Sequence, residues 1–252
     1  MNIRQQKIKE LINETGEARL SELEEMFPDY SAMTIRRDLD KLESMGEVVR
    51  TRSGAKSIAH LSRLNEPLYS ERAREHIAEK SEIAKKAHGL IEQGSTVFMD
   101  AGTTVTELAK MLANDKLFVI TTAPNIALEC IKRPDVSVFM TGGRLSSGNL
   151  SLSGINAVGF LDQINIDIAF MAASGATLKN GFTSGNYDES QIKKRVIEKA
   201  AKVVMLADSS KYAKSLPFTF ASLSDINTLI TDDKMDQGFT DELRKHGVEV
   251  MI

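Results

Sequence analysis

The chain lacks the residues from which several common scaffolds and sites are built. Among its 252 residues there is one cysteine, Cys130, so an internal disulfide is excluded, and its four histidines show no metal-ligand spacing. No hydrophobic run approaches the roughly 18 residues that indicate a membrane span, and residues 1–15 are an amphipathic polar stretch rather than a secretion signal. We therefore expect a folded cytoplasmic protein with no metal site, no cofactor and no membrane anchor.

An excess of positive charge is also lacking. The formal net charge is -3, which argues against a uniformly basic nucleic-acid binder. The charge is nevertheless segregated near the amino terminus, because acidic residues dominate positions 14–29 and basic residues dominate positions 36–56. One side of this small region is therefore expected to face phosphates while the other faces water or a partner.

Three helices are predicted before residue 47. Hydrophobic residues recur at helical spacing over 3–15, and a short second helix follows, with Ser21 as its expected N-cap. Pro28-Asp29-Tyr30 then breaks the chain before a third helix over 31–46. Beyond it, 47–51 and 55–58 are short strand candidates that predict a projecting hairpin, or wing.

The third helix carries two kinds of side chain. Ile35, Leu39 and Leu42 lie at helical spacing and are expected to face a small core, whereas paired arginines crowd the first turns behind a capping Ser31. A core helix needs no paired arginines at its start, but a helix that enters a DNA groove does. The residues expected to contact DNA are Ser31, Met33, Thr34, Arg36, Arg37 and Lys41 on the helix, and Arg50, Arg52 and Lys56 on the wing.

An alternative interpretation is that Arg36 and Arg37 only solvate the helix or pair with nearby acids such as Asp40, as most surface charges do. The two preceding helices and the basic hairpin favour DNA contact over this alternative.

The second half of the chain has a different pattern. Residues 58–76 are charged, contain Pro67 and hold few hydrophobic residues, so we interpret them as a linker. Beyond them, short hydrophobic runs mostly separated by helical segments predict a largely parallel sheet covered by helices on both faces. The predicted strands are 96–99, 117–120, 136–140, 166–171, 203–206 and 228–230, with 248–252 as a candidate edge strand.

Small and polar residues follow most of these strands. In an open parallel sheet the loops after the carboxyl ends of the strands meet at one edge, where ligands bind. A glycine beside Thr103 and Thr104 at a helix start offers backbone N–H groups and hydroxyls that suit a phosphate, and Lys211 adds a positive charge. One such loop is usually an ordinary turn, but several at equivalent positions favour a ligand site.

Both halves resemble the DeoR family of bacterial transcriptional regulators. Residues 34–39, Leu42 and Gly46 match its amino-terminal winged helix-turn-helix. Further matches follow in order at 100–104, 125–129, 142–143, 151–154, 181–184 with Asn186 and Glu189, and 208–211. The resemblance implies a multidomain chain of α and α/β class: a winged helix-turn-helix domain over 1–57, a linker over 58–76, and a mostly parallel α/β effector-sensing domain over 77–252 related to the ribose-5-phosphate isomerase-like fold.

The function implied by the resemblance is repression of a carbohydrate-utilisation operon. The chain would bind double-stranded operator DNA as a homodimer or tetramer and respond to a phosphorylated sugar or sugar alcohol. The residues expected to bind this effector are Asp100, Gly102, Thr103, Thr104, Thr122, Gly142, Gly143, Asn186, Glu189, Asp208 and Lys211.

Two alternatives remain open. A sugar-phosphate isomerase would need a carboxylate base and a cation, which Asp100, Glu189, Asp208 and Lys211 would supply. A DNA binder with a non-functional sensor is the other. The attached DNA-reading region favours binding over catalysis, so no catalytic residue is assigned and no enzymatic activity is expected.

Overall fold

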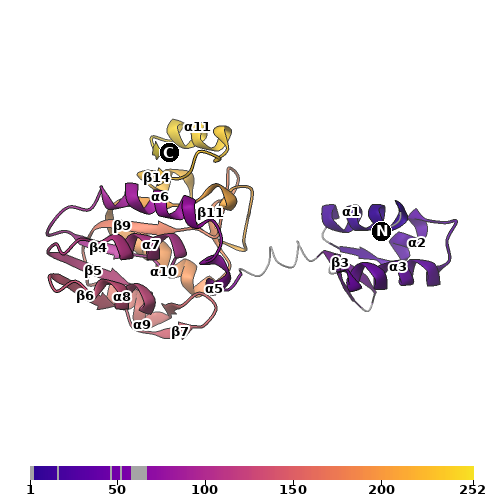
Figure 1. Ribbon diagram of the computed structural model, residues 1–252, viewed down its shortest axis with the longest axis horizontal. Helices are drawn as coiled ribbons and strands as arrows, with labels where there is room; N and C mark the ends of the chain where they lie inside the picture. Colours follow the sequence, from indigo (N-terminus) through magenta and orange to yellow (C-terminus); the bar gives the residue numbers. More distant parts are fainter. Residues whose placement is uncertain (1–2, 16, 46, 52, 58–66) are drawn as a thin grey trace. The chain divides into compact units, whose positions relative to one another are not determined.

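The computed structural model describes residues 3–15, 17–45, 47–51, 53–57 and 67–252, and it divides the chain into two compact units, Met1–Asn65 and Glu66–Ile252 (Figure 1). We call them the N-terminal unit and the C-terminal unit. Within the described ranges, no helix has the length and hydrophobicity needed to cross a membrane. No group of three or more His, Cys, Asp or Glu residues in those ranges is placed to hold a metal ion.

Helices and a small antiparallel sheet make up the N-terminal unit. Its elements in chain order are α1 (Ile3–Thr15), β1 (Glu17–Arg19), α2 (Leu20–Met26), α3 (Ala32–Ser44), β2 (Val48–Arg50) and β3 (Gly54–Ser57), and the strand order is β1-β3-β2. Ile8 and Ile12 of α1, Leu23 of α2 and the predicted core residues of α3 are fully buried together. This arrangement is a winged helix-turn-helix, so the predicted fold of this unit is confirmed.

Two details of this unit differ from the prediction. Strand β1 was not predicted, because three residues carry no readable alternation; it forms by pairing with β3, where Ala18 lies opposite Ala55. Ser21 is not the N-cap of α2, since the helix already begins at Leu20. The N-cap is Arg19, whose backbone N–H donates to the Glu22 side chain at 2.8 Å.

A seven-stranded parallel sheet forms the centre of the C-terminal unit. Its order is β15-β14-β12-β9-β4-β5-β6, and every neighbouring pair is parallel. The strands are β4 (Thr96–Met99), β5 (Leu117–Thr121), β6 (Val136–Met140), β9 (Ile166–Ala172), β12 (Ala200–Leu206), β14 (Thr228–Ile230) and β15 (Glu249–Met251). The predicted parallel sheet is therefore confirmed, including the edge position of the last strand.

Helices cover both faces of this sheet (Figure 1). One face packs against α6 (Ile77–His88), α7 (Thr103–Met111) and α8 (Pro124–Cys130), and the other packs against α9 (Ile155–Leu161), α10 (Tyr187–Lys199) and α11 (Gln237–Lys245). Successive strand residues alternate between the faces: Val97 and Met99 join the first core, and Phe98 joins the second. Burial on both faces explains why these strands are continuous hydrophobic runs.

Several short elements were not predicted. They are α5 (Tyr69–Arg72), the hairpin of β7 (Arg144–Ser146) and β8 (Ser151–Ser153), the antiparallel strands β10 (Gly175–Thr177), β11 (Gly181–Ser184) and β13 (Phe218–Ala221), and the 3-10 helices η1 (Ser209–Lys211) and η2 (Leu223–Asp225). Their strands are three or four residues long and rich in Gly, Ser and Thr, which read as turns in the sequence.

The end of the predicted linker belongs instead to the C-terminal unit. The Tyr69 hydroxyl of α5 lies 2.8 Å from Thr106 Oγ1, and the Tyr69 backbone N–H donates to Gly148 O at 2.7 Å. A helix of four residues is too short to show a hydrophobic periodicity, so its sequence is typical of a linker. Residues 58–66 of the predicted linker lie outside the described residues.

Candidate nucleic-acid interface and effector site

The start of α3 has the geometry that its sequence predicts. Ser31 is the N-cap, since its Oγ accepts a hydrogen bond from the Thr34 backbone N–H at 3.3 Å, and the two hydroxyl groups lie 2.9 Å apart. Met33, Arg36 and Arg37 are exposed. The first turns of α3 therefore present a polar, basic surface to solvent while the opposite face of the helix is buried.

The acids near these arginines are engaged elsewhere. Asp40 Oδ1 pairs with Arg50 Nη1 at 3.2 Å, and Glu43 accepts the Arg50 backbone N–H at 2.8 Å. In the described part of the chain, Arg36 and Arg37 have no ion pair with any acidic side chain. Their guanidinium groups are therefore available to phosphates or base edges, contrary to the alternative of pairing with Asp40.

The basic residues of the wing are less available than predicted. Arg50 does not project from the hairpin; its Nη1 donates to Arg36 O at 3.2 Å, so it lies against α3. Lys56 pairs with Glu17 at 3.1 Å across β1 and β3. Lys41 is exposed on α3, and Arg52 lies outside the described residues. These contacts indicate that Arg50 and Lys56 hold the wing to the rest of the unit.

The turn before α3 is held by a buried carboxylate. Asp38 pairs with Arg4 and accepts a hydrogen bond from Gln5 Nε2 at 2.8 Å, and the Arg4 guanidinium lies 3.9 Å from the centroid of the Tyr30 ring. The hydrogen bond to Asp38 raises the pKa of Arg4 above its ordinary value. One carboxylate thus ties the start of α1 to α3, and Arg4 ties the Pro28–Tyr30 turn to both.

We expect Asp38→Ala to lower the stability of the N-terminal unit by about 2–3 kcal/mol, because Arg4 and Gln5 lose their shared acceptor. Hydrogen exchange of α1 and α3 in the full chain measures this loss. The control is Asp29→Ala, which removes an exposed acid from the adjacent turn and is expected to stay within about 0.5 kcal/mol of wild type. Equal exchange in the two variants would contradict the role of Asp38.

At the carboxyl edge of the parallel sheet, Asp100 is bound into the fold. Its Oδ1 accepts the Ala101 N–H and its Oδ2 accepts the Ala172 N–H, each at 2.9 Å, and it forms an ion pair with Lys193. Lys193 also lies 3.2 Å from Glu189 Oε1. The three charged side chains are only 2–8% exposed. The structure therefore brings Asp100 and Glu189 together around a lysine that sequence reasoning missed.

A chain of hydrogen bonds leads from this lysine to α5. The other oxygen of Glu189, Oε2, accepts Asn149 Nδ2 at 2.6 Å, and Asn149 Oδ1 accepts Arg72 Nη2 at 3.2 Å. Arg72 Nε in turn donates to Pro67 O at 3.0 Å. The buried charges at the sheet edge are thus connected to the first helix of the C-terminal unit.

The three predicted glycines shape the backbone at this edge. A Cβ on Gly102 would meet Ala172 Cβ at 2.4 Å, and one on Gly143, at φ +108°, would meet Ser153 O at 2.4 Å. Gly142 also has a positive φ. The side chains of the three predicted threonines, Thr103, Thr104 and Thr122, are buried.

Asn186 has a capping role in this arrangement. Its side-chain oxygen accepts the Glu189 N–H at 3.1 Å, so it is the N-cap of α10. This cap fixes the helix turn from which Glu189 reaches Lys193.

Positive charges gather beside Asp208. Lys211 is 15% exposed and its Nζ lies 3.9 Å from Asp208 Oδ2, an atom that is buried and has no hydrogen-bond partner among the described residues. Burial lowers the pKa of Lys211, and the charges of Lys214 and Arg72 lower it further, while Asp208 acts in the opposite direction. Glu75 also raises the pKa of Lys211, but the net direction is downward, so the surroundings of Lys211 disfavour its charged form.

Lys80 belongs to the same cluster and was not predicted. It is buried, and its Nζ donates to Arg72 O and to Glu75 O, the latter at 2.5 Å, near the end of α5. Burial lowers the pKa of Lys80, and the charge of Lys211 lowers it further. Its sequence position inside an amphipathic helix offers no signal for this role, because the contacts come from α5.

A second buried acceptor lies in the first turn of α8, just after β5. Asn125 Nδ2 donates to the Tyr69 hydroxyl at 2.9 Å and to Thr106 Oγ1 at 3.1 Å, but Asn125 Oδ1 has no partner among the described residues. A buried acceptor without a donor costs stability unless a ligand or water satisfies it. Asn125 is therefore a candidate binding residue that was recognised in the sequence only as part of a matching run.

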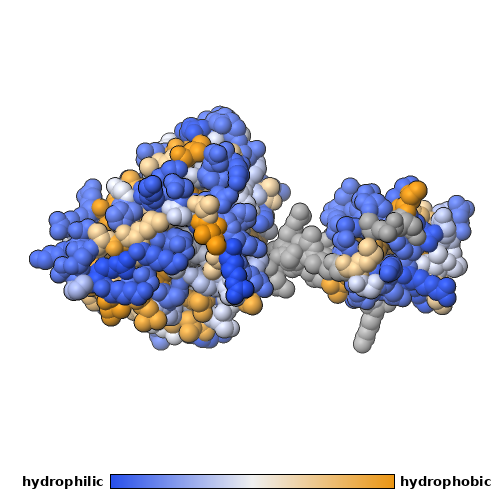
Figure 2. Space-filling view, viewed as in Figure 1, coloured by the Kyte–Doolittle hydropathy of each residue, from blue (hydrophilic) through white to orange (hydrophobic). Residues whose placement is uncertain are grey.

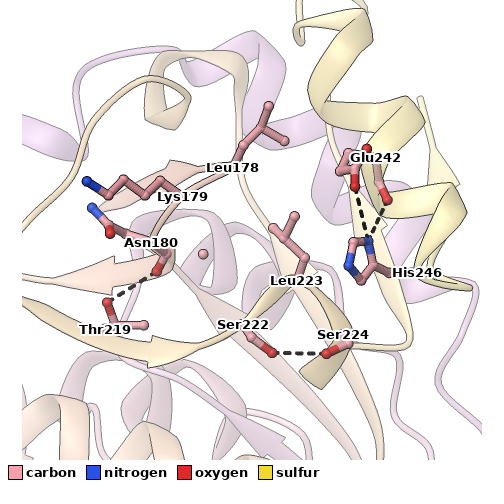
Figure 3. A pocket seen from close by; sticks show the side chains of 10 residues that line it. Leu178, Lys179, Asn180, Thr219, Ser222, Leu223, Ser224, Glu242 and His246 are labelled. Carbon is pink, nitrogen blue, oxygen red and sulfur yellow. Dashed lines mark hydrogen bonds and ion pairs between the residues drawn. The ribbon is translucent and has the colours of Figure 1, made fainter.

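A separate cavity of about 640 Å³ lies in another part of the C-terminal unit (Figure 3). It is lined by the turn between β10 and β11, by η2 and by the end of α11, where His246 contacts Glu242. Because η2 precedes β14 and α11 precedes β15, the cavity lies near the amino ends of these strands. None of the predicted effector residues lines it, so the candidate site stays at the opposite edge.

The chain matches known families over most of its length. Residues 4–60 match the model described as the DeoR-like helix-turn-helix domain, and residues 75–233 match that of the DeoR C terminal sensor domain. The HTH-type transcriptional regulator GlpR of Haloferax volcanii is 34% identical over 98% of this chain and 96% of its own. The HTH-type transcriptional repressor GlcR of Bacillus subtilis is 33% identical over 87% of this chain and 84% of its own.

Among solved structures, ribose 5-phosphate isomerase A from Methanocaldococcus jannaschii is similar over 54% of each chain, with a TM-score of 0.40 and 21% identity. A TM-score this low carries none of the enzyme's chemistry over to this chain. The relatives that match nearly the whole chain are named as regulators, not as enzymes. With both family models matching in order, the chain belongs to the DeoR family of helix-turn-helix transcriptional regulators, and it is a DNA-binding regulator rather than an enzyme.

Proposed function

We propose that this chain represses a carbohydrate-utilisation operon in the cytoplasm, and that a phosphorylated sugar or sugar alcohol bound at the carboxyl edge of the parallel sheet releases it from operator DNA. One observation carries the proposal: Lys211 lies 3.9 Å from Asp208 Oδ2, which is buried without a hydrogen-bond partner among the described residues, and the buried Lys80 is close enough for the charges of both residues to affect its pKa. The name of the relative GlcR, a transcriptional repressor, supports repression rather than activation.

The chemistry of the cluster favours a phosphorylated polyol. Burial is the main cause that lowers the pKa of Lys80 and Lys211, and neighbouring cations lower it further. A phosphate brings close to two negative charges, which would favour the charged form of both lysines. Hydroxyl groups are donors, and they would satisfy the buried acceptors Asp208 Oδ2 and Asn125 Oδ1. A phosphorylated sugar or sugar alcohol supplies both kinds of group in one molecule.

The predicted effector residues then divide into two groups. Lys211 and the backbone N–H groups of residues 102–104 at the start of α7 would hold the phosphate, while Asp208 and Asn125 would bind hydroxyls. Thr122 and Gly142–Gly143 would line the site. Asp100, Asn186 and Glu189 would position the surrounding loops, because their oxygens already accept hydrogen bonds from the fold.

A route for regulation runs through α5. Lys80 holds the carbonyl groups of Arg72 and Glu75, and α5 is the first helix after the chain leaves the N-terminal unit. A phosphate that attracts Lys80 would weaken its bonds to these carbonyls and change the preferred arrangement of α5. Effector binding would then favour a state in which a homo-oligomer no longer places two α3 helices in successive major grooves.

A thermal-shift screen of phosphorylated sugars and sugar alcohols tests the proposed function. Binding to the native state at 100 times Kd adds about 2.7 kcal/mol of stability, so a ligand should raise the Tm of the full chain while its unphosphorylated counterpart does not. A hit is expected to act on wild type and not on Lys211→Met. If no phosphorylated compound changed Tm, the non-functional sensor would be the better account.

The affinity for this effector is expected to fall as pH rises. In the free protein the pKa of Lys211 lies below its ordinary value of 10.5. As pH rises through that lowered pKa, the Lys211 side chain therefore loses its proton and its positive charge. A bound phosphate would raise the pKa, so binding takes up a proton in this window and weakens with increasing pH. Calorimetric titrations from neutral pH toward 10.5 measure the decrease. Lys211→Met is the control, and a wild-type affinity that stays constant over this range would contradict the role of Lys211.

A further inference from the structure

Strand β6 is one edge of the parallel sheet, and it lacks the features that usually protect an edge. It pairs with β5 on one side, and among the described strands none pairs with its other side. Its sequence, Val-Ser-Val-Phe-Met, holds no charge, proline or glycine. The opposite edge strand, β15, is only three residues long and carries Glu249. Exposed edges in monomeric proteins are normally short, charged or bulged, so β6 is an unusual surface for a free edge.

Large hydrophobic side chains surround this edge. Phe139 and Met140 on β6 are 46% and 41% exposed, Leu128 and Ile131 at the adjoining α8 are 69% and 67% exposed, and Leu145 on β7 is 53% exposed. We call these five residues the β6 patch. Figure 2 shows hydrophobic residues along the side of the C-terminal unit where Figure 1 places β6, α8 and β7. At roughly 100 Å² each, they reach the upper range of hydrophobic patches on monomers, where binding surfaces are found.

The charges beside the patch are paired among themselves. Glu129 on α8 lies 2.6 Å from Lys132 Nζ and 3.2 Å from Arg133 Nη1, and the hydrogen bond to Lys132 lowers the pKa of Glu129. Arg133 Nε also donates to Leu112 O at 2.9 Å. The patch itself carries no charge, and these three neighbouring side chains sum to only +1 because Glu129 contacts both cations. The surface therefore offers a highly charged partner little complement, and two identical patches would face each other with little repulsion.

We infer that the β6 patch is a self-association surface, on which β6 pairs with β6 of a second copy of this chain about a two-fold axis. Antiparallel pairing would satisfy the edge N–H and C=O groups of both copies and continue the sheet through the interface. It would also bring together two DNA-binding units, as recognition of two operator half-sites requires. This assignment does not depend on the effector, so a failure of the phosphosugar proposal would leave it unaffected.

Analytical ultracentrifugation of the full chain tests this surface. Wild type is expected as a dimer or a larger even oligomer, and Phe139→Lys and Leu128→Glu are each expected to halve its mass at the same concentration. Leu178→Lys changes a leucine outside the patch whose exposure is close to that of Phe139, and it should keep the wild-type mass. Circular dichroism establishes that the variants are folded. A monomeric wild type, or patch variants with unchanged mass, would overturn the inference.

Cross-linking provides a second readout that does not depend on a destabilising change. Cys130 is buried and burial raises its pKa to about 12, so a cysteine introduced by Phe139→Cys would be the reactive thiol. A short bis-maleimide should convert Phe139→Cys, but not Leu178→Cys, into a covalent dimer. Failure of Phe139→Cys to cross-link, or equal cross-linking of both variants, would contradict the proposed contact.

Discussion

Lys193→Ala is expected to destabilise the C-terminal unit by about 3–5 kcal/mol, the usual cost of removing one partner of a buried ion pair. Asp100 and Glu189 would remain buried without their shared cation, and Ala172 O would lose the donor that lies 2.9 Å away. The same loss would release the loops after β4 and β9 from α10. We therefore expect the variant to lose both thermal stability and its response to any effector.

Urea unfolding of the full chain, monitored in the C-terminal unit, measures this effect. Lys194→Ala is the matched control, because Lys194 is the next residue on α10 and is exposed; its loss should cost no more than about 0.5 kcal/mol. Lys193→Met keeps the aliphatic stem and tests the charge alone, and it should remain destabilised. Unfolding midpoints that coincide for the Lys193 and Lys194 variants would show that the buried pairs do not stabilise the fold.

The second large effect is expected at α3. Arg37→Ala should weaken operator binding by about 1–3 kcal/mol, which is roughly 5- to 150-fold, if the guanidinium reads a base edge. The double variant of Arg36 and Arg37 should reduce affinity further. Neither change should alter the thermal response to an effector, since both side chains are exposed in the N-terminal unit.

Fluorescence anisotropy with labelled operator measures these affinities at several salt concentrations. Loss of a phosphate contact should reduce the slope of log affinity against log salt concentration by about one. Loss of a base contact should instead relax the preference for the operator sequence. Lys7→Ala removes an exposed charge from α1 and serves as the control. Unchanged operator affinity for Arg37→Ala at physiological salt would exclude α3 as the recognition helix in the predicted orientation.

The sheet was predictable because its strands are buried on both faces. Val97, Phe98 and Met99, for example, enter two different cores in succession, so all three positions are hydrophobic and the strand is a visible run. The antiparallel strands β10, β11 and β13 are short and rich in small residues, and they form only through pairing with one another. No local periodicity marks such strands, so their sequences are typical of loops.

The sequence predicts where a ligand site is expected but not its detailed contacts. Ligands bind at the carboxyl ends of parallel strands, so the loops at Asp100 and Asp208 are the predicted candidates, and the structure places both loops at that edge of the sheet. Which side chains remain available there depends on contacts between distant residues: Lys193 and Asp100 are 93 positions apart. Arg72 and Lys80 come from segments that read as linker and helix. Such long-range pairs leave no spacing pattern in one sequence.

The central claim is that a ligand at the Lys211 cluster controls DNA binding, and operator titration with and without a phosphosugar that raises Tm tests it most directly. We expect the compound to weaken operator affinity at least 10-fold in wild type, a coupling of about 1.4 kcal/mol, and to have no effect on Lys211→Met, which should still bind operator. Equal operator affinity with and without the compound in wild type, or an unchanged response in Lys211→Met, would contradict this account.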